Sequence, residues 1–525
     1  MLPSPHVHRV IIWAAAVCLV GAAQAGVAAE RVILQPGTKQ LFLDGGVIDR
    51  LKRVRRTLNQ PRKYTGNPII KADPNHPWES RYIQTRDAPV WNPEARRWEL
   101  LYWGNNLSTC LAVSADGLTW TKPVVGRHAV KGSKQNNLLW PFDPKAKQVF
   151  LYHRLYDARD SDPRRRWKAL IGERSPRPAA SPDGYAWTFL SEKQIPSGEE
   201  HHLTYDELGG QFVFALRTKD ANGRRAVALS TSKDFVRWSA PKLIYQADPH
   251  DQELARQWLK RHLADPTRRK PLVNDPNQWN AQVYNMAVFP YEGIYIGLPT
   301  YFRMCGHSGK APAGDGFSEM GLAVSRDLVN WRRVSGVEGF IPLSPISDGA
   351  YDTAQIEPSS RPIRRGDELW FYYSGLKYRY ATDDRHLSFD TGAICLAMLR
   401  VDGFASLDAG DREGVILTKP LVWRGSALWV NADADEGELR TEVLDAECKP
   451  VKGMTREDCL AVSADGVRLP IRWKRRVGCD SLRGQTIRLR FYLRNARLYA
   501  FWSEARQAKS SRQANPAGPG KPDRP

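Results

Sequence analysis

Two glutamates and two histidines stand side by side in the run Gly198-Glu199-Glu200-His201-His202, directly before an apolar stretch that begins at Leu203. A carboxyl group in a partly apolar setting can stay protonated at neutral pH and donate a proton, and an imidazole beside it can bind a substrate. Neighbouring side chains of a strand point to opposite faces, so only one of Glu199 and Glu200 can face a common site. We expect that residue to be Glu200, with His202 beside it.

Two further acidic residues stand in the same position relative to an expected strand. Asp87 lies in Arg86-Asp87-Ala-Pro-Val-Trp, and Glu357 lies in Asp352-Thr-Ala-Gln-Ile-Glu357-Pro-Ser-Ser-Arg361. Two carboxyl groups can do acid–base chemistry together if one stays protonated and the other is ionised. The candidate catalytic residues are therefore Asp87, Glu200 and Glu357. The candidate substrate-binding residues are Arg86, His201, His202, Tyr284, Asn285, Asp352 and Arg361.

A repeated pattern indicates how these residues are brought together. Ser, Asp and Trp recur at offsets 0, 2 and 6 in four places, which begin at Ser114, Ser181, Ser232 and Ser325. Recurrence of one supersecondary unit is typical of a repeat fold. Hairpin patterns upstream of the turns predict four-stranded antiparallel units near residues 80–123, 136–192, 199–244, 283–335 and 352–402. We expect an all-β, five-bladed β-propeller over residues 32–405, in which an N-terminal strand from Lys39 to Asp44 completes the last blade.

The aspartates of the repeated pattern are predicted to be structural. Ser and Asp side chains can accept hydrogen bonds from backbone N–H groups two or three residues further on, which stabilises a tight turn. We therefore expect Asp116, Asp183, Asp234 and Asp327 to shape turns. The inner strands of different blades converge on one axis, so the acids that precede those strands can meet although they are distant in sequence.

The remaining segments have other patterns. Residues 1–25 resemble a secretory signal peptide, so we expect an exported protein, periplasmic or extracellular, without a membrane span after cleavage. Residues 251–263 have helical periodicity within an insertion at about 248–282. Short alternating strands over 412–502 predict a β-sandwich, and residues 503–525 have the composition of a disordered tail.

The formal net charge of +20 limits the choice of partner. Lys and Arg are spread along the whole chain without a basic stripe, which argues against nucleic acid. An acidic or sulfated glycan is compatible with the charge, as is a solvated basic surface without a ligand. The cysteines match no zinc pattern, and export permits a disulfide of Cys448 with Cys459 or Cys479, although the sequence does not fix the pairing.

A five-bladed propeller with these turns, followed by a sandwich, resembles the glycoside hydrolase superfamily of families 32, 43 and 68, over about residues 40–502. The appended sandwich is most similar to that of family 32. The resemblance implies that Asp87 is the base or nucleophile, that a glutamate such as Glu200 or Glu357 is the general acid, and that the substrate is a carbohydrate. The family 32 run Trp-Met-Asn-Asp-Pro-Asn and its Glu-Cys pair are absent, and Arg159-Asp160-Ser-Asp162-Pro163 is only superficially similar to its Arg-Asp-Pro motif.

The leading hypothesis is thus an exported glycoside hydrolase that cleaves an oligo- or polysaccharide by carboxylate acid–base catalysis. Three alternatives stay open: a carbohydrate-binding propeller without catalysis, a sialidase-like enzyme with an arginine triad and a tyrosine nucleophile, and a polysaccharide lyase with His202 or a tyrosine as base. No cofactor is expected, and calcium has no ligand motif to support it.

Overall fold

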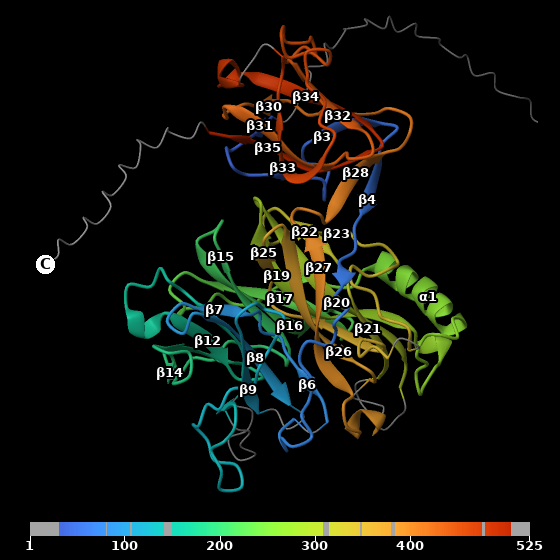
Figure 1. Ribbon diagram of the computed structural model, residues 1–525. Coiled ribbons are helices and arrows are strands. Elements are labelled where there is room, and N and C mark those ends of the chain that lie inside the picture. Colours follow the sequence, from blue (N-terminus) through green and yellow to red (C-terminus); the bar gives the residue numbers. More distant parts are fainter. Residues whose placement is uncertain are drawn as a thin grey trace, which may run out of the picture.

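The computed structural model describes residues 31–79, 81–104, 108–140, 150–307, 314–346, 349–379, 384–474 and 478–505. The predicted signal peptide and nearly all of the predicted tail lie outside these residues. The described chain is all-β apart from one α-helix and short 3₁₀ turns. Figure 1 shows a larger part that contains α1 and a smaller part built from both ends of the chain.

The larger part contains antiparallel meanders. The first consists of β6 (Ile83–Gln84), β7 (Val90–Asn92), β8 (Arg97–Gly104), β9 (Thr109–Ser114) and β10 (Leu138–Trp140). The second consists of β11 (Leu151–Tyr156), β12 (Trp167–Ile171), β13 (Arg177–Ser181) and β14 (Thr188–Phe189). The third consists of β15 (His201–Asp206), β16 (Gln211–Lys219), β17 (Arg225–Ser232) and β18 (Lys242–Tyr245).

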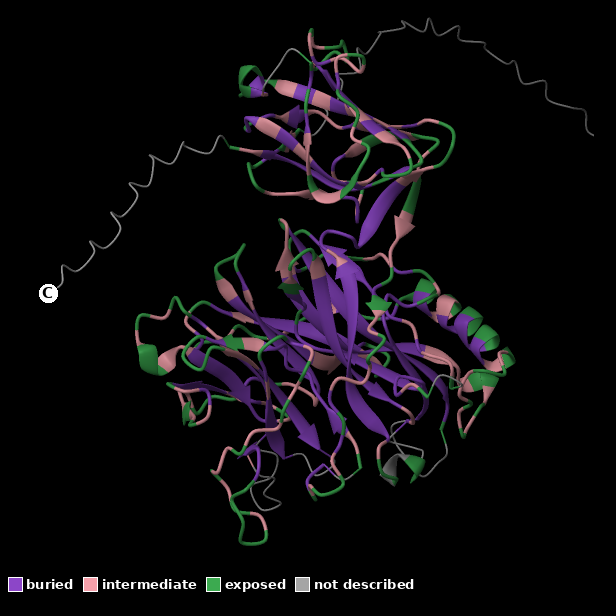
Figure 2. Ribbon diagram, viewed as in Figure 1, coloured by how far each residue is buried: buried purple, intermediate pink, exposed green. Residues whose placement is uncertain are grey.

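Two further meanders share one sheet. The fourth consists of β19 (Asn280–Tyr291), β20 (Ile294–Gly306), β22 (Ala323–Ser325) and β23 (Trp331–Arg333). The fifth consists of β24 (Gln355–Pro358), β25 (Ile363–Arg365), β26 (Glu368–Leu376), β27 (Gly392–Arg400) and β5 (Arg62–Lys63). They are joined by β21 (Asp315–Met320), which pairs with β20 and, in parallel at Ser318 and Gln355, with β24. Figure 2 shows that the strands in the centre of this part are buried.

The strand that completes the fifth meander differs from the prediction. Arg62 and Lys63 of β5 pair with Met398 and Ala397 of β27. The predicted segment from Lys39 to Asp44 instead contributes β2 (Gln40–Leu41), which pairs with β35 at the other end of the chain. β5 consists of two basic residues that follow a proline, so it carries no strand pattern, whereas the segment from Lys39 to Asp44 does; the sequence therefore favoured the wrong segment.

The smaller part contains two sheets of six strands each. One holds β1 (Val32–Ile33), β3 (Ile48–Lys52), β29 (Gly414–Thr418), β30 (Leu421–Val422), β32 (Glu438–Leu444) and β34 (Thr486–Arg494). The other holds β2, β4 (Arg55–Leu58), β28 (Ala405–Ala409), β31 (Ala427–Asp433), β33 (Asp465–Ile471) and β35 (Ala496–Glu504). Phe42, Ile416, Leu439, Phe491 and Phe501 belong to the buried cluster that the two sheets share.

The boundaries of the two parts therefore differ from those predicted. Residues 32–58 pair with strands of residues 405–504, whereas the sequence analysis assigned them to the propeller. The last strand runs to Glu504, slightly past the expected start of the tail. The physical reason is that residues 32–58 bury apolar side chains, such as Leu34 after β1 and Phe42 after β2, in the same cluster as the C-terminal strands.

The repeated Ser-x-Asp turns have the geometry that their residues predict. In the first, Asp116 Oδ1 accepts hydrogen bonds from the backbone N–H groups of Leu118 and Thr119, both at 2.8 Å. Asp183, Asp234 and Asp327 each accept the two equivalent bonds. Burial opposes ionisation of Asp116, but these amides lower its pKa to about 2. The turn aspartates are thus committed to the backbone.

The predicted helix is present as α1 (Pro249–Ala264), which begins at the N-cap Asp248. Asp248 and Asp251 form a capping box, in which each side chain accepts a hydrogen bond from the other residue's backbone N–H. Trp258 and Leu259 are buried and pack against the core beside Phe317. The outer face of α1 is exposed in Figure 2. Short 3₁₀ turns lie at Pro163–Arg165, Pro276–Gln278, Asp384–Leu387 and Asp480–Leu482.

The six cysteines after residue 31 are all free thiols. The proposed pairing of Cys448 with Cys459 or Cys479 is therefore wrong: Cys448 is exposed, whereas Cys459 and Cys479 are buried. Within the described ranges, no helix has the length and apolar character needed to cross a bilayer. The same residues contain no cluster of three or more His, Cys, Asp or Glu side chains placed to hold a metal ion.

Candidate functional site

Several of the candidate site residues lie where the first strands of the meanders are irregular, whereas Glu357 lies in the regularly paired β24. Arg86 and Asp87 occupy the gap between β6 and β7, both of which pair with β8. Tyr284 and Asn285 lie at a register shift in β19, between Val283 and Met286. Glu200 precedes β15 with a φ of 79°, which is unusual for a residue other than glycine. Such strained positions persist only where surrounding contacts fix them, and they cluster at functional sites.

Arg86 and Glu200 form the closest ion pair of the cluster. The guanidinium group donates from Nε to Glu200 Oε2 at 2.6 Å and from Nη2 to Glu200 Oε1 at 2.9 Å. The Arg86 side chain is 1% exposed and that of Glu200 is 7% exposed. A buried, bidentate pair is the geometry of an ionised carboxylate, because the two parallel charge-assisted bonds offset the cost of removing both charges from water.

Glu357 joins this pair through Asn285. The Nδ2 atom of Asn285 donates to Glu357 Oε2 at 2.7 Å and lies 3.3 Å from Glu200 Oε2. The guanidinium group of Arg86 lies 3.8 Å from Glu357. Burial raises the pKa of Glu357 to about 7, and the charge of Glu200 adds to this rise while Arg86 opposes it. Glu357 Oε1 is buried without a hydrogen-bond partner, which suits a protonated carboxyl group that can donate.

His202 and Tyr284 border the cluster. His202 is 1% exposed, and burial followed by the charge of Arg86 lowers its pKa well below 6.5, so the ring is neutral at pH 7. Its Nδ1 lies 3.4 Å from Ser360 Oγ. Tyr284 is 2% exposed and interacts electrostatically with Arg86. Three guanidinium groups surround the Tyr284 ring, those of Arg217, Arg225 and Arg379, at 5.5, 5.5 and 5.8 Å from its centroid.

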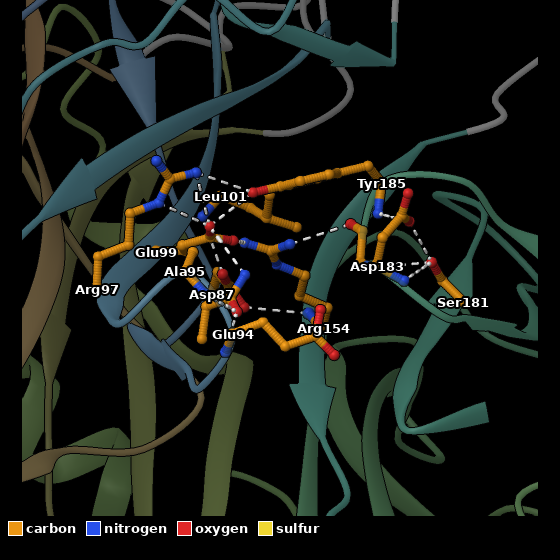
Figure 3. Close-up of polar contacts among 12 residues, drawn as sticks. Asp87, Glu94, Ala95, Arg97, Glu99, Leu101, Arg154, Ser181, Asp183 and Tyr185 are labelled. Atoms are coloured by element: carbon orange, nitrogen blue, oxygen red, sulfur yellow. Dashed lines mark hydrogen bonds and ion pairs between the residues drawn. The ribbon is translucent and has the colours of Figure 1, made fainter. Parts of the chain in front are cut away.

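The Asp87 carboxylate binds backbone amides of two other strands. Its Oδ2 accepts a hydrogen bond from the Leu101 backbone N–H at 2.9 Å, and its Oδ1 accepts one from the Arg154 backbone N–H at 3.1 Å. Leu101 belongs to β8 and Arg154 to β11. Figure 3 shows Asp87 between these two residues, close to the side chains of Arg154 and Glu99. Burial raises the pKa of Asp87 to about 7, while the positive charge of Arg154 opposes this rise. The carboxylate therefore joins the first and second meanders, and Arg86 occupies the position facing the glutamates.

Three other candidate residues also lie outside the cluster. His201 Nδ1 lies 2.9 Å from His153 Nε2, and His201 Nε2 lies 3.1 Å from the Gly172 carbonyl, so this ring joins the second and third meanders. Asp352 Oδ2 binds Lys63 at 2.6 Å and the Tyr373 hydroxyl at 3.0 Å. Arg361 is exposed and lies 3.6 Å from Glu207.

Two residues of the cluster were missed in the sequence analysis. The Thr300 hydroxyl donates to Asn285 Oδ1 at 2.8 Å, which turns the amide nitrogen of Asn285 towards the glutamates. Arg379 is 3% exposed, binds Gln355 Oε1 at 2.6 Å, and its charge lowers the pKa of Glu357. Neither residue belongs to a motif, since Thr300 lies within an apolar strand and Arg379 lies beyond the end of β26. Strand pairing alone brings them to the site.

The arrangement provides the two protonation states that acid–base cleavage needs. Glu200 is bound as an ionised carboxylate, and Glu357 holds its proton up to about neutral pH. The two groups differ because Glu200 receives two hydrogen bonds from Arg86, whereas Glu357 receives one from Asn285. Neighbouring carboxyl groups with such unequal environments can act as an acid and a base, or as an acid and a nucleophile.

No family model matches the chain, and no curated protein matches it. Solved structures with a similar course of the chain include an N-acetylgalactosamine deacetylase from F. plautii, with 14% identity and a TM-score of 0.37, covering 67% of this chain and 97% of that one. The catalytic domain of the Coprinopsis cinerea GH62 α-L-arabinofuranosidase has 13% identity and a TM-score of 0.38, covering 64% and 97%. A thermostable family-43 glycoside hydrolase has 13% identity and a TM-score of 0.36, covering 63% and 92%. These values are too low to place the chain in a family, so the site geometry carries the functional argument.

Proposed function

We propose that the protein is a glycoside hydrolase whose general acid is Glu357 and whose ionised carboxylate is Glu200. The observation that carries this proposal is the contact of both glutamates with one amide nitrogen, Asn285 Nδ2, while Glu357 has a raised pKa. Glu357 gives its proton to the leaving oxygen of the glycosidic bond. Glu200 either attacks the anomeric carbon or takes a proton from the attacking water, and water supplies the new hydroxyl in both cases.

The proposal includes the architecture inferred from the sequence. The five meanders are the blades of a propeller that β5 closes, and the smaller part is a sandwich that both ends of the chain build. The support is that the four-stranded order recurs in each meander and that residues in or next to the first strands of different meanders meet at Arg86, Glu200, Asn285 and Glu357. In this arrangement Asp87 has a structural role, in contrast to the role implied by the resemblance.

The experiment is a hydrolysis assay over a panel of aryl glycosides and polysaccharides, with the anomer of the first product followed by NMR. The wild-type chain, Glu357→Gln and Glu200→Gln are compared at equal folded concentration. We expect turnover of at least one substrate and its loss in both variants. Turnover that both variants retain contradicts the proposal. Binding of a glycan without turnover of any panel member would indicate a carbohydrate-binding propeller without catalysis. The burial of the Glu357 and Arg86 side chains, each 1% exposed, favours this alternative.

A second candidate is a sialidase-like enzyme, because three arginines surround Tyr284. In that mechanism the arginines bind the substrate carboxylate and the tyrosine hydroxyl is the nucleophile. Tyr284→Phe separates the two candidates, since it removes only the hydroxyl. Loss of sialoside cleavage in Tyr284→Phe supports the second candidate. Retention of activity in Tyr284→Phe, together with its loss in Glu200→Gln, supports the first.

A further inference from the structure

A pocket of about 590 Å³ lies beyond the glutamate cluster along the same chain segments. Some of its lining residues lie one or two positions after cluster residues: Ala88 lies two positions after Arg86, and Leu203 follows His202. Ser360 marks the boundary, because it lines the pocket while its hydroxyl donates to the Arg86 carbonyl at 3.0 Å. The volume falls within the range of small-molecule binding sites. None of Arg86, Glu200 and Glu357 lines the pocket itself.

Aromatic rings with fixed orientations form part of its wall. Trp91 is 42% exposed and packs edge-on against Trp98, with ring centroids 5.5 Å apart. Tyr205 packs edge-on against the buried Phe212 at 5.1 Å, and the Arg159 guanidinium lies over the Tyr205 ring. A large exposed indole that a neighbouring ring holds in place offers a flat apolar surface for the face of a sugar ring. Such stacking costs little side-chain entropy because the plate is already ordered.

The arginines of the lining have unequal partners. Arg154 is committed to Glu99 at 2.7 Å, and Arg159 is committed to Asp157 at 2.7 Å. Arg361 lies 3.6 Å from Glu207, which is beyond the distance of a strong hydrogen bond. Arg364 is exposed. Within the described residues its guanidinium group donates only to the Gly366 carbonyl, from Nε at 3.1 Å. The rim near Arg361 and Arg364 is therefore positively charged and able to bind an anion.

The acids of the pocket are poorly placed for catalysis. Asp157 is paired with Arg159 and lies 3.5 Å from Lys168, so it is held as an ion-paired carboxylate. Glu207 is the other acid of the lining, and its side chain is 59% exposed. No two carboxyl groups of the lining share a donor as Glu200 and Glu357 do. The lining thus provides stacking and charge recognition without a pair of catalytic carboxyl groups.

We propose that this pocket is a non-hydrolytic binding site for a sugar unit that carries a carboxylate or a sulfate group. The sugar ring stacks on Trp91, and the anionic group is bound by Arg361 and Arg364, whose planar guanidinium groups match the oxygens of either anion. The proposal is independent of hydrolysis at the glutamate cluster. It also gives a use to Arg361, which the sequence analysis selected for substrate binding and which the structure places here.

The test is affinity electrophoresis of the full chain carrying Glu357→Gln, so that a polymer is bound without being cleaved. Native gels contain polygalacturonate, dextran sulfate or neutral dextran, which separate carboxylate, sulfate and neutral recognition. We expect retardation by at least one anionic polymer and not by dextran. The double variant Arg361→Ala/Arg364→Ala should weaken the apparent affinity more than tenfold. Trp91→Ala should weaken it similarly, and Trp91→Phe should restore most of it.

The control is Arg424→Ala, which removes an exposed arginine from the smaller part of the molecule. Equal losses in Arg424→Ala and in the double variant would show that the net charge of +20 attracts the polymer non-specifically, and would overturn the proposal. Equal retardation by dextran, or full retention of affinity in the double variant, would overturn it as well. Thermal unfolding of each variant shows whether a loss of binding arises from a loss of folded protein.

Discussion

The guanidinium group of Arg86 donates two hydrogen bonds to the carboxylate of Glu200, at 2.6 and 2.9 Å, while both side chains are almost completely buried. The two residues are separated by 114 positions in the chain. The pair fixes the charge of one glutamate and leaves the neighbouring Glu357 with the less favourable environment for ionisation. The proposed division of roles between the two acids thus follows from which one Arg86 binds through both oxygens.

Replacement of the proposed acid should affect substrates according to their leaving groups. Glu357→Gln removes the proton donor, and we expect kcat to fall by about 10²–10⁴ on a substrate with a poor leaving group. An aryl glycoside with an acidic phenol needs little protonation, so its kcat should fall much less. Steady-state kinetics on the two substrates measure this difference. The control Glu368→Gln changes a half-exposed carboxylate of the same meander and should leave kcat unchanged.

The pH dependence of activity should show the titration of Glu357. The reaction needs the protonated acid, so kcat should fall as the pH rises through about 7. Stability should change in the same direction. Because burial raises the folded-state pKa of Glu357 above its ordinary value of 4.5, the folded state binds more protons than the unfolded state, and the free energy of unfolding falls as the pH rises from about 4.5 to 7. Urea unfolding at several pH values measures this slope, and Glu357→Gln should reduce it.

Asp87→Asn tests whether Asp87 is structural. Both oxygens of Asp87 accept backbone N–H groups, so an amide would lose one of these bonds and place two donors face to face. We expect the free energy of unfolding to fall by about 1–3 kcal/mol. The kcat per folded molecule should stay within a few fold of the wild-type value. An unchanged melting temperature together with a loss of turnover would instead assign Asp87 to catalysis, as the resemblance implies.

Thr300 is expected to be a positioning residue. Thr300→Val keeps the side-chain shape but removes the hydrogen bond that orients Asn285. The Asn285 amide then binds the glutamates less well, and since this bond lowers the pKa of Glu357, the basic limb of the pH profile should move to higher pH. Thr188→Val, at an exposed position of β14, is the matched control. A uniform loss of kcat at all pH values with no shift of the limb would contradict this role.

The free thiols predict the pattern of chemical labelling. Cys448 is exposed, whereas Cys110, Cys305, Cys395, Cys459 and Cys479 are buried. Of these six cysteines, a thiol reagent should therefore label Cys448 rapidly in the folded protein and the five others only after unfolding. Intact-mass spectrometry counts the labels. A disulfide between Cys448 and either Cys459 or Cys479 would appear as the loss of two labels even in denaturant.

The sequence by itself determined the units and their turns. The Ser-x-Asp turns are local, because their hydrogen bonds connect residues two or three positions apart, and local geometry follows from residue type. The helix that begins at Asp248 and the acids before the first strands could be found in the same way. Strand alternation was the reason for choosing Glu200 over Glu199, but both residues precede β15 and Glu200 has a φ of 79°, so the rule does not apply to them. Glu199 binds Arg174 at 2.7 Å.

Only the tertiary structure decided which of the candidate residues meet. Arg86 and Asp87 are neighbours in the gap between β6 and β7, but they have different partners. The Arg86 side chain binds Glu200, whereas the Asp87 carboxylate binds backbone amides of β8 and β11. The strand that completes the fifth meander was decided in the same way, since β5 is two basic residues without a strand pattern and only its pairing with β27 identifies it. Contacts between residues hundreds of positions apart depend on the burial of whole sheets, and a local pattern does not encode them.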